Sequence, residues 1–113
     1  MQYTQEQINT IVAEAQTEAR KAAEQFFQTK LGGRDQFACG FAWVTVYEKG
    51  STKLGRALIE AGFRKAYGGG LQLWNPSGMM VQNVDTLEAG AEAAAEFLTE
   101  TLGVKFYAGS RLD

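Results

Sequence analysis

Few side chains in this sequence have the types and spacing that catalysis or metal binding requires. Its 113 residues include no histidine and a single cysteine, Cys39. The lack of histidine excludes Ser-His-Asp and Cys-His catalysis and imidazole metal sites. One cysteine can form neither an internal disulfide nor a cysteine zinc site. Cys39 lies in a predicted strand with no base or cation nearby to activate a thiol, and we expect it to be a buried structural residue.

The acidic residues do not form a pair suited to general acid–base catalysis. Most fall on the outer faces of predicted helices or at helix caps, and only Asp35, Glu48 and Asp85 lie near strand ends or loops. Because no convergence of these groups is visible, the sequence does not support an enzyme. We expect no catalytic residue, no metal site and no cofactor.

One loop-like stretch, residues 74–85, has the composition of a polar ligand site. Trp74, Asn75, Gln82 and Asn83 could stack on a ligand and form hydrogen bonds with it. The alternative is a well-packed loop whose amides satisfy its own backbone. The preceding run of three glycines, residues 68–70, lacks the spacing of a Walker loop and predicts a hairpin turn.

A basic cluster lies between the first predicted strand and this hairpin. Five of the eleven cationic residues fall within 17 positions. They could contact phosphate or an acidic partner, or they could form a solvated edge that protects the hairpin strands from aggregation. The cluster comprises Lys49, Lys53, Arg56, Arg64 and Lys65.

The predicted elements indicate an α+β fold in one domain, residues 1–113. Thr4 with Gln7, and Asp85 with Glu88, have the spacing of capping boxes. The expected order is a helix over 5–30, a strand over 37–47, a helix over 52–61, strands over 63–67 and 71–75, a helix over 85–102 and a strand over 104–108, before a short tail. The N-terminal helix, within residues 1–33, packs on the core of residues 37–113 or extends from it.

After the first helix, the order β-α-β-β-α-β is typical of a ferredoxin-like domain. It predicts a four-stranded antiparallel sheet with the last two helices on one face, the first and last strands central, and the hairpin strands towards the edges. An α+β sheet with another strand order is the alternative.

Side chains alternate along a strand, so the predicted sheet has one small or aliphatic face and one large face. Both tryptophans fall on the large face, away from the two helices. This face gathers Phe41, Trp43, Thr45, Gln72, Trp74, Lys105 and Tyr107. Large exposed apolar patches are unusual on a monomer, so we expect the N-terminal helix, a second copy of the chain in a homo-oligomer, or a planar nucleotide-like ligand to cover it. The net charge of −2 argues against nucleic acid.

Four short motifs resemble a family of small, mostly uncharacterised proteins of tailed bacteriophages. They are Cys39-Gly40-Phe41-Ala42-Trp43-Val44, Tyr67-Gly68-Gly69 followed by Leu73-Trp74, Glu88-Ala89-Gly90-Ala91, and Ser110-Arg111-Leu112-Asp113. The likeness covers residues 37–113 and implies a phage product in the cytoplasm of an infected bacterium. In the predicted sheet the tail ends near the first strand, so we expect Arg111 and Asp113 to join the aromatic residues in one site.

No apolar run is long enough to span a membrane, and the N-terminus has no export signal. From the resemblance and the small size of the chain, we expect a non-enzymatic phage accessory protein that forms a homo-oligomer. It would bind a host protein or a small nucleotide-like ligand, in counter-defence or host modulation. The alternatives are a structural or assembly component of the virion, and a single-stranded nucleic-acid binder that uses Phe41, Trp43 and Trp74.

Overall fold

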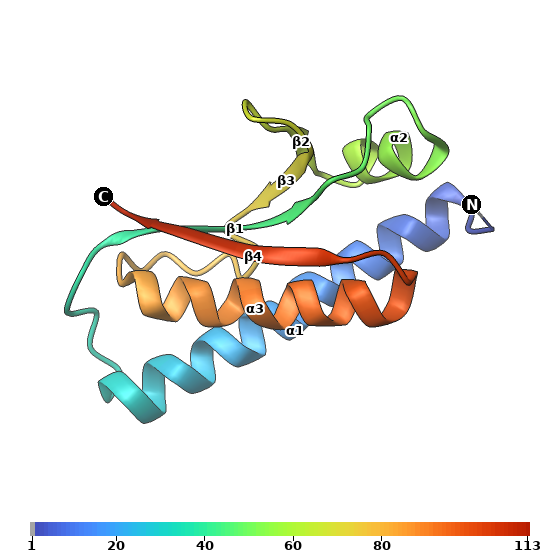
Figure 1. The fold of residues 1–113 in the computed structure, drawn as a ribbon. Coiled ribbons are helices and arrows are strands. Elements are labelled where there is room, and N and C mark those ends of the chain that lie inside the picture. The colour runs from blue at the N-terminus through green and yellow to red at the C-terminus, as the bar shows by residue number, and fades with distance from the viewer. Residues whose placement is uncertain (1) are drawn as a thin grey trace.

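The computed structural model describes residues 2–113, which form three helices and four strands. In chain order these are α1 (Gln5–Leu31), β1 (Gly40–Val46), α2 (Lys53–Glu60), β2 (Arg64–Lys65), β3 (Leu71–Trp74), α3 (Val84–Leu102) and β4 (Phe106–Leu112) (Figure 1). No helix in this range is long and apolar enough to cross a membrane. The α+β class expected from the sequence is confirmed.

The helix caps explain where α1 and α3 begin. At α1 the Thr4 hydroxyl accepts from the Gln7 N–H and the Gln7 side chain accepts from the Thr4 N–H, which is the predicted capping box. At α3 the prediction is wrong, because Asn83 and not Asp85 is the N-cap. The Asn83 side chain accepts from the Thr86 N–H, so α3 begins one residue earlier than predicted.

The four strands form one antiparallel sheet in the order β2-β3-β1-β4. β1 is central as predicted, but the prediction that the last strand is central is wrong, since β4 is an edge and β3 is central. The hairpin turn at residues 68–70 is confirmed, with the Ala66 N–H donating to the Gly70 carbonyl. β4 suits an edge because its C-terminal half, from Gly109 to Leu112, is exposed or only half-buried.

The strands β1, β2 and β4 differ from their predicted bounds. β1 begins at Gly40 and not at 37, so Cys39 lies outside the strand and is exposed, which corrects its assignment as a buried residue. β4 continues to Leu112, through residues predicted to be a tail. Gly109 and Ser110 have weak strand propensity, and pairing with β1 holds them extended.

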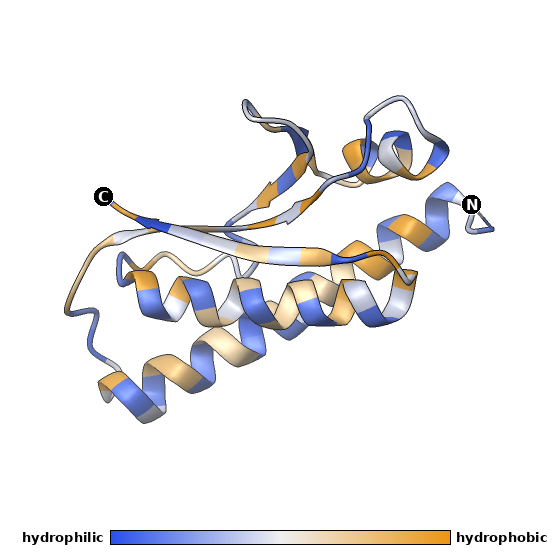
Figure 2. Cartoon of the chain, in the orientation of Figure 1, coloured by the Kyte–Doolittle hydropathy of each residue, from blue (hydrophilic) through white to orange (hydrophobic). Residues whose placement is uncertain are grey.

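The helices lie on one side of the sheet. Figure 1 shows α3 directly beneath the strands with α1 crossing behind it, and Figure 2 shows hydrophobic and hydrophilic segments alternating along both helices. The core joins buried residues of all three helices to the small face of the sheet: Ile8, Val12, Ala42, Val44, Leu58, Leu71, Leu73, Ala91, Leu98 and Phe106.

Gly90 brings α1 and α3 into close contact. A Cβ at Gly90 would lie 3.1 Å from the Ala19 carbonyl oxygen and 3.4 Å from the Ala23 Cβ. The sequence predicts that Gly90 serves an approach of helix to sheet, and the structure assigns it to an approach of helix to helix. Of the three coverings proposed from the sequence for the aromatic side of the sheet, the N-terminal helix is excluded, because α1 packs against α3 and α2.

Candidate functional site

The face of the sheet turned away from α1 and α3 is the candidate site, and we call it the aromatic face. All seven residues predicted for it are present, and four more join them: three through strand pairing, and Tyr47 through its ring contact with Tyr107. It consists of Phe41, Trp43, Thr45, Tyr47, Arg64, Gln72, Trp74, Lys105, Tyr107, Gly109 and Arg111. The intervening residues Ala42, Val44 and Val46 are buried against the helices.

Three rings and a glycine form a first aromatic cluster at one end of this face. Trp43 is paired with Trp74 on one side and with Gly109 on the other. The centroids of the two indoles are 4.8 Å apart, and the Phe41 ring meets Trp74 edge-on at 6.2 Å. The Trp43 indole lies against Gly109, where a Cβ would come within 2.5 Å of the Trp43 Nε1.

Arg111 completes this cluster with a cation. It is paired with Phe41, and its guanidinium carbon lies 5.4 Å from the Phe41 ring centroid and 6.0 Å from that of Trp74. These distances allow cation–π attraction to both rings. The prediction that Arg111 joins the aromatic strand is confirmed. Asp113 lies close to the start of β1, since its N–H donates to the carbonyl of Cys39, the residue before that strand.

A second aromatic cluster lies at the other end of β1. The Tyr47 and Tyr107 rings are 5.8 Å apart, and the Lys105 Nζ lies 5.5 Å from the Tyr107 centroid. Polar residues separate the two clusters. Gln72 accepts a hydrogen bond from the Trp74 indole N–H at 3.1 Å and donates one to the Thr45 hydroxyl at 3.5 Å.

The rings on this face are open to solvent. The exposed fractions are 75% for Tyr47, 46% for Trp74 and Tyr107, and 39% for Phe41. No element within residues 2–113 packs against them, because all three helices contribute to the core on the opposite side. An open patch of large apolar side chains on this scale marks an interaction surface.

The charge of the aromatic face has one sign. It holds three of the eleven cationic residues and none of the thirteen acidic ones. Arg64, Lys105 and Arg111 form no ion pair with any acid in the described part of the chain, where the two ion pairs both lie on α1. Two acids flank these strands along the chain: Glu48 directly follows Tyr47, and Asp113 lies beyond the end of β4. A net negative chain therefore presents a positive, aromatic surface.

The polar side chains of the loop after β3 mainly form hydrogen bonds within the protein. The Asn75 amide donates to the Met79 carbonyl, and its oxygen accepts from the Ser77 hydroxyl. Asn83 is buried, and its side chain caps α3 while donating to the Gln36 carbonyl at 2.6 Å. These contacts leave Asn83 no group for a ligand, which corrects its place among the predicted ligand residues. The Gln82 side chain stays exposed and accepts from the Cys39 thiol at 3.5 Å.

Asp35 has a positioning role that the sequence did not indicate. Its carboxylate accepts from the backbone N–H groups of Gln82 and Asn83, at 2.8 and 2.9 Å. These bonds tie the connection before β1 to the start of α3. Asp35 is 47 and 48 residues from its partners, and no spacing rule could find such a pair.

The predicted basic cluster does not converge on one point. Arg64 is paired with Gln72 and belongs to the aromatic face, whereas Lys65 is the next residue along the strand and points the other way. On α2, Arg56 donates to the Ser51 carbonyl at 2.7 Å. Lys49 and Lys53 are exposed beside it. Only Arg64 contributes to the candidate site.

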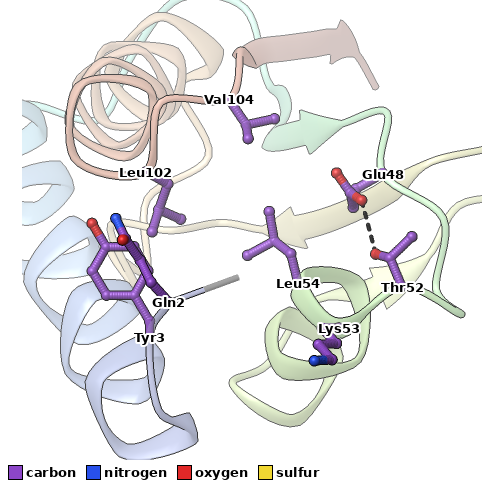
Figure 3. A pocket seen from close by; sticks show the side chains of 8 residues that line it. All are labelled: Gln2, Tyr3, Glu48, Thr52, Lys53, Leu54, Leu102 and Val104. Atoms are coloured by element: carbon purple, nitrogen blue, oxygen red, sulfur yellow. Dashed lines mark hydrogen bonds between the residues drawn. The ribbon is translucent and has the colours of Figure 1, made fainter.

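Two hollows in the surface lie near the sheet and the helix ends. The larger, about 740 Å³, lies between the start of α1, α2 and the end of α3, and is lined by Tyr3, Leu54 and Leu102 (Figure 3). Its acid, Glu48, accepts from the Thr52 hydroxyl, as the dashed line in Figure 3 marks. The smaller, about 470 Å³, continues the aromatic face beyond Phe41 and Trp74. Among residues 2–113 no group of three or more acidic or cysteine side chains could hold a metal ion.

No protein-family model, curated protein or solved structure matches this chain. The resemblance to phage proteins therefore stays a prediction, and the site is interpreted from its own geometry.

Proposed function

We propose that this protein is a non-catalytic binding protein that holds a nucleotide-like ligand on the aromatic face. The observation that carries the proposal is the combination of five exposed or half-exposed rings with three unpaired cations and no acid on one open surface. Rings stack on planar bases, and cations pair with phosphate oxygens. One ligand class, an anion with a flat ring, uses both features.

The same charges argue against a second copy of the chain on this face. A two-fold interface sets the surface against itself, which would bring the unpaired cations Arg64, Lys105 and Arg111 against their own copies. The homo-oligomer predicted from the sequence would therefore need another surface, such as the free edge of β4. Light scattering on the purified chain tests this, and a monomer at all concentrations would contradict it.

A host protein is the other predicted occupant. Exposed tryptophan, tyrosine and arginine residues are also typical of protein interfaces. A protein partner that matches this face would have to supply acidic side chains, whereas a nucleotide supplies both the ring and the negative charge. The nucleotide-like ligand is for this reason the proposal we favour.

For the fold, we propose the ferredoxin-like class in particular. The order β-α-β-β-α-β after α1 and the placement of β1 between β3 and β4 support it. For the setting, we propose the cytoplasm of a phage-infected bacterium, with a role in counter-defence or host modulation. That setting depends on the resemblance alone, and finding the chain in purified particles would favour a virion component instead.

Intrinsic fluorescence tests the proposed binding directly. Both tryptophans of the chain, Trp43 and Trp74, lie on the aromatic face, so the emission reports on this surface. We expect a nucleoside triphosphate or a short oligonucleotide to quench it, and Trp74→Ala to weaken the binding measured by calorimetry. Lys21→Gln, which removes one cation from α1, is the control. Absence of binding to both mononucleotides and oligonucleotides would refute the proposed function.

A further inference from the structure

We infer that the ligand of the aromatic face is a single strand of nucleic acid, engaged at two stacking sites. This inference rests on the proposed function, because it names the form in which the nucleotide is bound. It reverses the expectation from net charge, since the −2 of the whole chain does not describe the face that would meet the ligand.

The first argument is the duplication of the stacking site. One cluster contains Trp43 and Trp74 with the Arg111 cation, and the other contains Tyr47 and Tyr107 with Lys105 beside them. Trp43 and Tyr47 are four residues apart in sequence and on the same face, a distance of roughly 13 Å along an extended chain. One base cannot stack on both clusters, whereas consecutive nucleotides of a strand can. Each cluster provides a ring surface for a base and a cation for a phosphate.

The second argument is the shape of the surface. Small-molecule sites are concave and bury most of their ligand. The aromatic face is instead an open sheet surface with Tyr47, Trp74 and Tyr107 strongly exposed. A lone nucleotide could be enclosed only in the hollow of about 470 Å³ beyond Phe41 and Trp74, which includes neither Tyr47 nor Tyr107. A strand gains affinity by linking two weak contacts, because binding at one cluster raises the effective concentration at the other.

The third argument concerns the form of the nucleic acid. Bases in a duplex are stacked on one another and are not free to stack on protein rings, while those of a single strand are. The polar residues between the clusters have limited freedom to read base edges, because the Gln72 side chain already bonds to Trp74 and Thr45. We therefore expect little sequence preference and strong dependence on salt.

The test is a length series, from mononucleotides to oligomers of about ten nucleotides, in both deoxyuridine and uridine forms, followed by fluorescence quenching and calorimetry. Affinity should rise at least tenfold from the mononucleotide until both clusters are occupied, and then level off. The slope of log affinity against log salt should approach about −2 for three phosphate contacts to a single strand. A clear preference for one of the two forms would show whether the 2′-hydroxyl is recognised.

Two variants separate the clusters. Trp74→Ala should weaken both mononucleotide and oligonucleotide binding. Tyr107→Ala should weaken oligonucleotide binding by about 5- to 150-fold, the loss of one stacked base, and should weaken mononucleotide binding less, because the first aromatic cluster can still hold a single base. Tyr67→Ala, which removes a fully exposed ring from the hairpin, is the matched control, and circular dichroism checks that each variant is folded.

Three results would overturn the inference. Equal affinity for a mononucleotide and for every oligomer would show that the ligand is not a nucleic-acid strand, and would leave the proposed nucleotide binding intact. Tighter binding of duplex than of single strand would show that stacking is not used. Binding of an acidic peptide in the absence of any oligonucleotide binding would assign the face to a protein partner instead.

Discussion

The indole of Trp43 rests directly on Gly109, its partner across the β1–β4 pair. A Cβ at that glycine would lie 2.5 Å from the Trp43 Nε1 and 2.7 Å from the Cε2. Because Gly109 has no side chain, the Trp43 indole can lie against the backbone of β4. That position fixes the orientation of the Trp43 ring relative to the Trp74 ring. The first aromatic cluster depends on a glycine in a strand that supplies none of its rings.

Replacing this glycine should disturb the site without destroying the sheet. We expect Gly109→Ala to push the Trp43 indole away, to lower the free energy of unfolding by about 1–3 kcal/mol as in other overpacked sites, and to change tryptophan emission. Urea denaturation followed by fluorescence measures both effects. Gly68→Ala is the control, because a Cβ at Gly68 meets nothing within 4 Å, and its stability should change by no more than about 0.5 kcal/mol. Equal effects of the two substitutions would contradict the assignment.

Arg111 should contribute to binding through both its charge and its planar shape. Arg111→Gln removes one phosphate contact and should reduce the magnitude of the salt slope by about 0.7 for a single strand. Arg111→Lys keeps the charge but loses the planar group that lies near Phe41 and Trp74. We expect the lysine variant to retain the slope and still bind more weakly than the wild type. Titrations at several salt concentrations distinguish the contribution of the charge from that of the planar shape. An unchanged salt slope in Arg111→Gln would show that Arg111 does not contact a phosphate.

The N-cap of α3 can be located by mutation. Asn83→Ala removes the acceptor for the Thr86 N–H and the donor to the Gln36 carbonyl, and should cost at least about 1 kcal/mol of stability. Asp85→Ala, at the cap predicted from the sequence, should cost at most about 1 kcal/mol through the helix dipole. Thermal or urea unfolding of the pair is the measurement, and a larger loss in the Asp85 variant would reverse the assignment.

Asp113 should oppose an anionic ligand. It follows β4 close to Cys39 and lines the hollow that continues the aromatic face. Asp113→Asn keeps the backbone bond and removes the carboxylate charge, so affinity for a nucleotide or an oligonucleotide should rise, and the gain should shrink as salt screens it. Glu14→Gln on α1 is the charge-matched control. A fall in affinity would mean that the Asp113 side chain assists binding.

The elements that depend on local signals were predictable from the sequence. The Thr4–Gln7 capping box and the Gly32 stop place α1, which ends within one residue of the prediction. The alternation along β1 likewise places Phe41 and Trp43 on one face. These features involve residues a few positions apart, where chain geometry leaves little choice.

The features that depend on distant contacts were not predictable in this way. Gly109 and Ser110 were predicted to form an irregular C-terminal tail. They are part of β4 because β1 provides their hydrogen-bond partners, and the edge position of β4 follows from that pairing. Asn83, the N-cap of α3, is also held by bonds to Asp35 and Gln36, 48 and 47 residues away. In both cases the deciding partner lies in another part of the chain.

Alternation of side chains along the strands was enough to predict from the sequence that both tryptophans lie on one face of the sheet. The sequence by itself did not determine whether that face is covered. The apolar stripe of α1 could have packed on either side, and the tertiary structure decided the matter at Gly90, where the missing side chain lets α1 approach α3 through Ala19 and Ala23. With α1 held there, the rings of the aromatic face and their three cations are left open to a ligand.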